Sequence, residues 1–493
     1  MKSGMAISTF KTAGGQFFGL LFGAVAVKLL AILAGPAGVG LYSVLRQLQQ
    51  MLSSVGSIGG QNAVVQGLSS HTGEERQRFF LSTLYVFLVM SLVVGGAVLA
   101  SADLIAQWVL AGDHASAVRW LVIPVTLGTL LFFLRGVLTA DMQYGSVAII
   151  NLLTGLGAAV VALPAGLAFT HGYPNLLVLL VSGGLVPALA VAFIHVRRLG
   201  YLASFSELAP RGASREATRR FLRVALPSLL SLMLTMGCVL VVRARAVHLY
   251  GLEGAGQFDA AWSISAMYLA LFLTSLQSYL LPELSKTDKG EALHAALSKA
   301  FHFALMLSLP LIVGLVVFKP LVMNLLFSKA FVPALDVLRW VLLGDFVRVL
   351  GWVMSTALMA RADMKGYALA EGLWSLVFVS CALLLLPYGI EWVGVAYLLG
   401  YVAYLVFLGW RLWQVHGARL ELRRVGQWFA ALGLIILVSW LCWDEQRMFS
   451  LSMLMIFPAM LFSWTIMQAD ERGFALHLAS QSVGRLKRLI GRR

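Results

Sequence analysis

The sequence has little charge and few of the residues that mark soluble or disulfide-linked domains. Only 12% of its 493 residues are Asp, Glu, Lys or Arg, and it contains three cysteines and 13 prolines. All three cysteines, at positions 238, 381 and 442, lie inside apolar runs, so neither a disulfide framework nor a zinc site is indicated. No hydrophilic stretch is long enough to form a soluble domain, which excludes a large soluble all-α protein.

Hydrophobic residues make up 60% of the chain, and apolar runs of about 20 residues recur along its whole length. This pattern predicts an all-α polytopic membrane protein with about 14 transmembrane helices. The first apolar run contains Lys28 and shows no convincing cleavage site, so we expect it to remain as the first span.

Positive charge is abundant but unevenly distributed. The chain has 37 Lys and Arg against 22 Asp and Glu, and if the N-terminus is cytoplasmic, most of these cations fall in cytoplasmic segments. That bias is typical of membrane proteins and predicts that the N- and C-termini both lie in the cytoplasm. It accounts for the net charge without a nucleic-acid partner.

The sequence repeats one design in its two halves. Gly35, Gly38 and Gly40 return with the same spacing as Gly251, Gly254 and Gly256. Because each copy holds six predicted spans, the copies should be parallel repeats that form two lobes around a central cavity. The predicted segments are a first lobe over 1–200, a basic cytoplasmic linker over 201–223, a second lobe over 224–415, two additional helices over 416–470 and a cytoplasmic amphipathic tail over 471–493.

A polar stripe follows the first set of glycines. Ser43, Arg46, Gln50, Ser53 and Ser57 recur at helical spacing within an otherwise apolar segment. Hydrocarbon cannot satisfy such groups, so the stripe must face other helices or water. We expect Ser43, Gln50, Ser53 and Ser57 to form the polar lining of the cavity.

Four cations lie near these glycines at similar predicted depth. Lys28 and Arg46 flank the first set, about 10 Å below the external turn, and Arg243 and Arg245 precede the second set. As a group they are expected to form a cationic cavity, and the alternative is that they extend to the external headgroups. Arg135, nearer a cytoplasmic end, is expected to contact headgroups or loops.

Three embedded charges are candidates for coupling or gating. Asp345 and Arg348 form an i,i+3 pair that either binds a coupling ion or holds helices together. Asp259 occupies the repeat position of Ser43, where it either neutralises Arg243 or Arg245 or acts as a coupling carboxylate. The sequence leaves open whether the ion is a proton or sodium.

Catalytic and cofactor motifs are not evident. The nine histidines are scattered, no metal-ligand spacing stands out, and Gly35–Gly40 does not match a phosphate-binding loop. We therefore expect no cofactor and a non-enzymatic activity.

Several short motifs resemble those of a known family. Val27-Lys28-Leu29-Leu30-Ala31, the glycine-rich turn and Arg46-Gln47-Leu48 resemble the opening of bacterial lipid-linked oligosaccharide flippases of the Wzx type. These are O-antigen and enterobacterial common antigen translocases in the polysaccharide-transport branch of the multidrug/oligosaccharidyl-lipid/polysaccharide exporter superfamily. Leu325-Leu326-Phe327 with Phe331 and Ala334 is similar to a later segment of that superfamily, and the resemblance covers roughly residues 5–415.

The resemblance implies a bacterial inner-membrane transporter that moves undecaprenyl-pyrophosphate-linked glycans, such as O-antigen units, by alternating access. The polysaccharide polymerase machinery would be a partner. A drug or cation exporter of the same superfamily, a membrane enzyme of glycan polymerisation or ligation, and a scaffold remain alternatives. The embedded charges, which are mostly basic, favour an anionic substrate over a cation.

Overall fold

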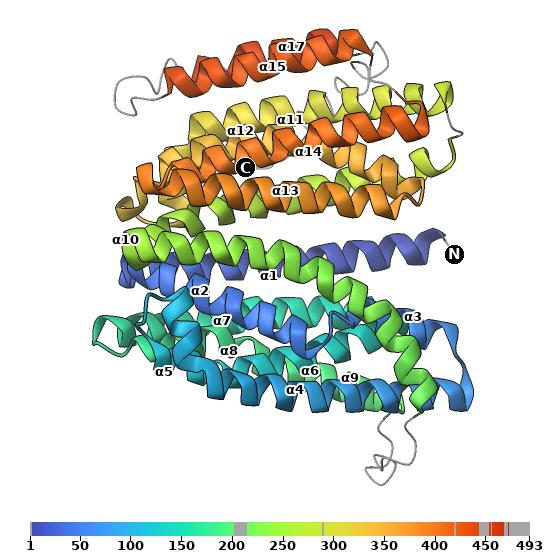
Figure 1. Cartoon of the computed structure of the whole chain (residues 1–493), viewed down its shortest axis with the longest axis vertical. Coiled ribbons are helices and arrows are strands. Elements are labelled where there is room, and N and C mark those ends of the chain that lie inside the picture. Colours follow the sequence, from blue (N-terminus) through green and yellow to red (C-terminus); the bar gives the residue numbers. More distant parts are fainter. Residues whose placement is uncertain are drawn as a thin grey trace, which may run out of the picture. The chain divides into compact units, whose positions relative to one another are not determined.

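The computed structural model describes residues 2–201, 214–287, 290–418, 421–442, 453–454, 456–467 and 472. These residues form helices and turns, with no strand among them (Figure 1). The helices are α1 (Lys2–Leu33), α2 (Gly35–Gly56), α3 (Gln61–Ser70), α4 (Gly73–Val109), α5 (Ala115–Trp120), α6 (Val122–Ala140), α7 (Tyr144–Thr170), α8 (Leu177–Gly183), α9 (Leu185–Arg198), α10 (Arg215–Ser285), α11 (Glu291–Leu326), α12 (Ala334–Ala360), α13 (Met364–Leu385), α14 (Trp392–His416), α15 (Leu422–Leu441) and α17 (Ile456–Ile466). Short 3₁₀ turns cover Pro174–Leu176, Lys329–Phe331 and Leu386–Tyr388.

Many of these helices have the length and composition of membrane spans. Within the described residues, 10 helices are long and apolar enough to cross a bilayer, and the shorter apolar helices are Phe17–Leu33 and Ile456–Ile466. The predicted all-α membrane fold is therefore observed, whereas the count of 14 spans stays a prediction. Most of the basic linker and nearly all of the amphipathic tail lie outside the described residues.

The chain divides into two compact units. Unit 1 comprises Met1–Met267, Met323–Val337 and Glu371–Ala396, and unit 2 comprises Tyr268–Val322, Leu338–Ala370 and Tyr397–Arg493. Helices α10 to α14 each contribute residues to both units.

The repeated glycines lie at matching bends in unit 1. Gly35 is the first residue of α2, just after the break from α1, and Gly251 interrupts α10; their φ angles are 62° and 66°. Side-chain-bearing residues rarely adopt this left-handed conformation, so glycine is required at both bends. The first residues after each bend pack together: a Cβ on Gly40 would overlap the carbonyl of Leu252, and one on Gly256 would overlap that of Pro36.

Small residues also allow α1 to lie along α7 (Figure 1). A Cβ on Gly15 would lie 2.6 Å from the Cα of Ala148, and one on Gly155 would lie 3.0 Å from the Cα of Gly19. Such close backbone approach is common where membrane helices associate without a hydrophobic driving force.

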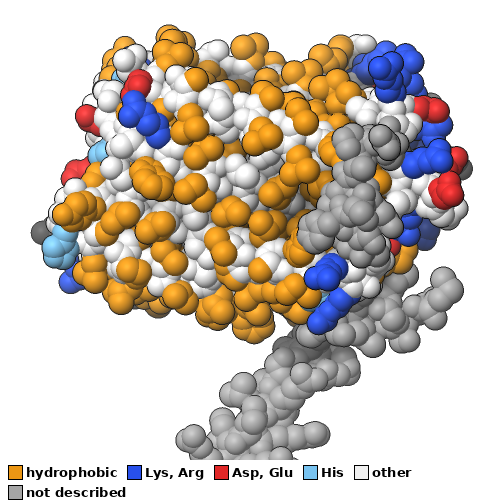
Figure 2. Space-filling model, turned by 90° about the horizontal axis from the view of Figure 1, so that it is seen from below, with side chains coloured by type: hydrophobic (Ala, Val, Ile, Leu, Met, Phe, Trp, Pro, Cys, Tyr) orange, Lys and Arg blue, Asp and Glu red, His pale blue; other side chains and the backbone are white. Residues whose placement is uncertain are grey.

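The outer surface of unit 1 has the polarity expected in a bilayer. Figure 2 shows hydrophobic side chains across the middle of one face and charged side chains gathered at its two ends. On α4, the exposed middle carries Leu92 and Val93, while Glu74 and Glu75 lie in its first turn. This distribution matches a hydrocarbon band between two polar interfaces.

Candidate functional site

Unit 1 contains a cavity of about 770 Å³ between α1, α2, α6, α7, α8, α10 and the end of α11. Its walls combine apolar residues with a set of polar and aromatic side chains. That set is Tyr42, Arg46, Gln47, Gln49, Gln50, Phe132, Arg135, Asn151, Thr154, Thr235, Arg243, Asp259, Trp262, Ser263 and Phe327.

The most tightly held charge in this wall is Arg243 on α10. Its Nη2 donates to Asp259 Oδ1 at 2.7 Å, and the two side chains are 4% and 3% exposed. Its Nη1 donates to the main-chain oxygen of Ser43 at 3.1 Å and to Gln47 Oε1. A buried charge needs such partners, because an uncompensated one is strongly destabilising. Of the two roles predicted for Asp259, the structure therefore shows the neutralisation of Arg243.

Arg46 reaches the same wall from α2. Its guanidinium lies 5.5 Å from the centre of the Tyr42 ring, one helical turn earlier, in a cation–π arrangement. Gln47, next to it, donates from Nε2 to the main-chain oxygen of Met236 at 3.0 Å. Because Gln47 also accepts from Arg243, it fixes α2 against α10 between the two arginines.

Arg135 on α6 is a third cation in the cavity wall. Two contacts show how far along the helices Arg135 lies. Near the start of α6, Gln49 Nε2 on α2 donates to Pro124 O at 3.1 Å. Near the end of α6, a Cβ on Gly136, the residue after Arg135, would lie 3.2 Å from Gln61 O. The backbone of Arg135 is thus level with the start of α3, roughly 20 Å along the helices from that of Arg46. Within the described part of the chain, no ion pair to Arg135 is observed, and its Nε is buried without a hydrogen-bond partner.

The charges in the cavity do not cancel. Among the described residues that line it, there are three guanidinium groups, of Arg46, Arg135 and Arg243, and a single carboxylate, that of Asp259. A net positive cavity of this kind attracts anions, and guanidinium groups pair well with phosphate oxygens.

The other two cations of the predicted group lie elsewhere. Lys28 donates from Nζ to the main-chain oxygens of Asn324 and Phe327 at the end of α11, where a cation stabilises the unpaired carbonyls of a helix C-terminus. Arg245 is exposed and does not line the cavity. Of the four cations expected to form the cavity, Arg46 and Arg243 line it in the structure, whereas Lys28 and Arg245 do not.

The predicted polar lining is also divided. Gln50 lines the cavity, but Ser43, Ser53 and Ser57 do not and are fully or almost fully buried. The Ser53 hydroxyl donates to Val125 O at 3.0 Å, and those of Ser43 and Ser57 donate to carbonyls one turn earlier on their own segment. Backbone oxygens satisfy all three hydroxyls, and only that of Ser53 joins α2 to another helix, α6.

Asp345 and Arg348 lie in a buried cluster in unit 2. Asp345 is 0% exposed and accepts hydrogen bonds from Tyr268 at 2.6 Å and from Tyr397 at 2.7 Å, one on each carboxylate oxygen. Arg348 donates to the same Tyr397 hydroxyl at 3.1 Å, and its guanidinium lies 5.3 Å from the Tyr401 ring centre. Tyr397 therefore links the two charges.

Arg135 is the cavity cation that the sequence interpretation assigned elsewhere. Its predicted depth near a cytoplasmic end favoured contact with headgroups or loops. One feature of the sequence could have indicated the cavity: Arg135 is a lone arginine within the apolar helix α6, and charged side chains rarely face lipid. No group of three or more His, Cys, Asp or Glu side chains suited to a metal ion occurs among the described residues.

The sequence matches known proteins over most of its length. Residues 29–336 match the family described as "Polysaccharide biosynthesis protein". The lipid III flippases of Escherichia coli (strain K12) and Shigella flexneri are each 27% identical over 409 residues, which is 80% of this chain and 94% of theirs.

Solved structures show the same fold. The lipid II flippase MurJ, in an inward closed conformation, aligns with a TM-score of 0.73 at 16% identity and covers 94% of this chain and 98% of its own. An inward-facing multidrug resistance MATE family transporter of the MOP superfamily aligns with a TM-score of 0.63 at 18% identity, over 80% and 93% of the two chains. The resemblance noted in the sequence is confirmed.

Proposed function

Because the chain belongs to the polysaccharide biosynthesis protein family, we propose that it is a flippase for undecaprenyl-pyrophosphate-linked oligosaccharides, such as O-antigen-like repeat units. It moves them from the cytoplasmic to the periplasmic leaflet of the bacterial inner membrane. The names of its relatives support a lipid-linked glycan as the cargo. The protein is a transporter, and no chemical step is required of it.

The observation that carries this proposal is the charge of the cavity in unit 1. A pyrophosphate joined to a lipid and to a sugar keeps two negative charges. Arg46, Arg135 and Arg243, offset by Asp259, supply two positive charges in excess. Fixed cations spread along the cavity favour an anionic headgroup as it passes through about 30 Å of hydrocarbon.

The positions of the three arginines suggest how the headgroup moves. Arg135 is level with the start of α3, while Arg46 and Arg243 lie toward the glycine bends. With the predicted orientation, Arg135 meets the pyrophosphate first from the cytoplasmic side, and Arg46 and Arg243 receive it deeper in the membrane. Alternating access between the two predicted lobes, 1–200 and 224–415, then opens the other side.

Energy coupling is assigned to the buried cluster of unit 2. A carboxylate held by two phenol hydroxyls can exchange a proton when one of these partners moves away, so Asp345 is the coupling group and Arg348 its positioning partner. We favour a proton over sodium, because each carboxylate oxygen already accepts a hydroxyl. We also propose that both chain termini lie in the cytoplasm and that the protein contacts the polysaccharide polymerase machinery.

The rival function, export of drugs or other cations, is disfavoured by the same cavity. A net positive cavity repels a cationic cargo, which would need a free carboxylate to hold it. Here the single cavity carboxylate among the described residues is already paired with Arg243.

The test is the binding of undecaprenyl pyrophosphate to purified protein that stays monodisperse in detergent. Replacing Arg46 or Arg135 by Ala should each weaken binding by about 1.5–3 kcal/mol, the scale of a hydrogen bond to a charged group. Arg245→Ala is the matched control, because this exposed arginine lies outside the cavity. Equal affinity in all three variants and the unchanged protein would overturn the anion-cavity proposal.

A further inference from the structure

Trp262 is the one tryptophan among the described residues that line the cavity. It lies on α10, is partly exposed, and belongs to a row of stacked rings inside unit 1. Its ring centre lies 6.1 Å from that of Phe378 with 28° between the planes, and Phe378 in turn stacks on buried Trp374 at 5.4 Å and 14°. This row holds the indole of Trp262 in a fixed orientation at the cavity wall.

Phe258 connects this aromatic row to the charged part of the site. The fully buried Phe258 ring lies 5.5 Å from the Trp262 ring, and the Arg243 guanidinium lies 5.5 Å from the centre of the same Phe258 ring. Asp259, which holds Arg243, precedes Trp262 by three residues, so the two side chains lie on one face of α10 about 4.5 Å apart along its axis. The Arg243 guanidinium and the Trp262 indole therefore both neighbour the Phe258 ring, and both line the cavity.

We infer that Trp262 is a saccharide subsite, on which the sugar attached directly to the pyrophosphate stacks. The C–H groups on one face of a pyranose ring form an apolar surface that packs against an aromatic face. A phosphate and its sugar are joined through a single oxygen, so a headgroup held by Arg243 places that sugar within reach of Trp262. This inference rests on the proposed function and names the part of the cargo that this chain selects.

A sugar subsite beside the pyrophosphate has a consequence for specificity. The arginines recognise any polyprenyl pyrophosphate, including the carrier lipid left after the glycan is removed. A rigid indole contributes only when a sugar is present, and it tolerates variation in the hydroxyl groups that point away from it. The aromatic wall of the cavity thus distinguishes the carrier lipid that bears a sugar from the carrier lipid without one.

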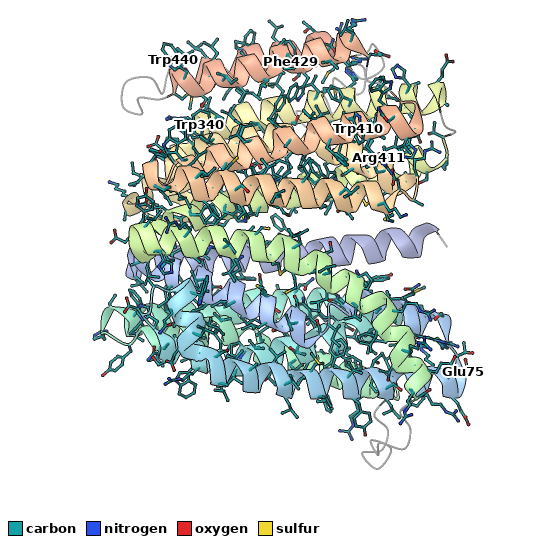
Figure 3. The ribbon with its side chains drawn as sticks, viewed as in Figure 1. Glu75, Trp340, Trp410, Arg411, Phe429 and Trp440 are labelled. Carbon is teal, nitrogen blue, oxygen red and sulfur yellow. The ribbon has the colours of Figure 1, made fainter. Side chains whose placement is uncertain are left out.

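The experiment compares two probes, undecaprenyl pyrophosphate and the same lipid carrying one N-acetylglucosamine. The unchanged protein should bind the sugar-bearing lipid about threefold to tenfold more tightly, the range expected for one aromatic contact. Trp262→Leu should abolish this preference and leave the affinity for undecaprenyl pyrophosphate unchanged, whereas Trp262→Phe should keep part of the preference. Trp440→Leu, at an exposed tryptophan of α15 (Figure 3), is the matched control and should behave like the unchanged protein.

The outcomes separate this inference from the proposed function. Equal affinity of the unchanged protein for the two lipids, or equal weakening of both by Trp262→Leu, would overturn the saccharide subsite and leave the anion cavity standing. A preference that survives in Trp262→Leu would overturn it as well. Failure of the unchanged protein to bind either lipid would overturn the proposed function and the subsite together.

Discussion

Gly40 and Gly256 meet backbone to backbone: a methyl group on Gly40 would lie 2.9 Å from the amide nitrogen of Gly256. Both belong to the repeated glycine motif, so the two copies of one sequence pattern are packed against each other within unit 1. Arg46 lies on the helix that carries Gly40, and Arg243 lies on the segment of α10 that precedes the Gly251 bend; both line the cavity.

Alanine at either of these glycines should destabilise the protein. Gly40→Ala or Gly256→Ala forces the segments apart, at an expected cost of about 1–3 kcal/mol. The measurement is the unfolding temperature in detergent. Gly237→Ala is the control, because a Cβ there meets no atom within 4 Å and Ala favours the helix. Equal unfolding temperatures for the three variants would contradict the close contact.

The two members of the ion pair, Arg243 and Asp259, should affect lipid binding differently when each is replaced. Arg243→Gln leaves a buried carboxylate without its cation, which should cost about 3–5 kcal/mol and weaken lipid binding. Asp259→Asn raises the positive charge of the cavity, so binding of undecaprenyl pyrophosphate should be kept or strengthened.

The double variant, Arg243→Gln with Asp259→Asn, completes the cycle. It should recover much of the stability lost in Arg243→Gln but not its lipid binding. Unfolding temperature and lipid affinity are measured on the same samples. Recovery of binding together with stability would show that Arg243 acts only in packing.

Asp345→Asn tests the coupling role of the buried cluster in unit 2. An amide keeps a hydrogen-bond acceptor for Tyr268 or Tyr397 but cannot take up a proton, so transport into vesicles should slow and lose its dependence on a pH gradient. Unfolding temperature should change little. Transport that still responds to the gradient in Asp345→Asn would exclude this residue as the coupling group.

Asp363, in the turn between α12 and α13, predicts a dependence of stability on pH. Hydrogen bonds from Arg411, labelled in Figure 3, hold the pKa of this carboxyl well below its usual range, with further help from the Gly366 amide and His416. A lowered pKa stabilises the fold at pH values above the unfolded pKa of about 3.9, and this contribution is lost as the pH falls toward the lowered value.

The measurement for Asp363 is the unfolding temperature between about pH 7 and pH 3. Asp363→Asn should be less stable than the unchanged protein at neutral pH and should lose less stability on acidification. Asp113→Asn, at an exposed loop position, is the control and should follow the unchanged protein. Parallel curves for the Asp363 variant and the unchanged protein would contradict the assignment.

The sequence was sufficient for the class of protein and for its internal repeat. Long apolar runs can satisfy their backbone groups in lipid only as helices, and Gly35 and Gly251 mark bends because few other residues adopt positive φ. Motifs at the first bend also carried the family resemblance. These features are local, so each can be recognised from a short stretch of sequence.

Only the tertiary structure decided which cations share the cavity. Position along a span predicts depth, but it does not say toward which neighbour a side chain points. Arg243 and Arg245 have nearly the same depth, yet two residues turn a helix by about 200°, so one lines the cavity and the other is exposed. Arg135 was assigned to the interface by its depth, and it belongs to the cavity because α2, α6 and α10 leave open space beside it. The direction in which a side chain points around its helix axis depends on packing against neighbours that are distant in sequence. A linear sequence pattern does not contain this information.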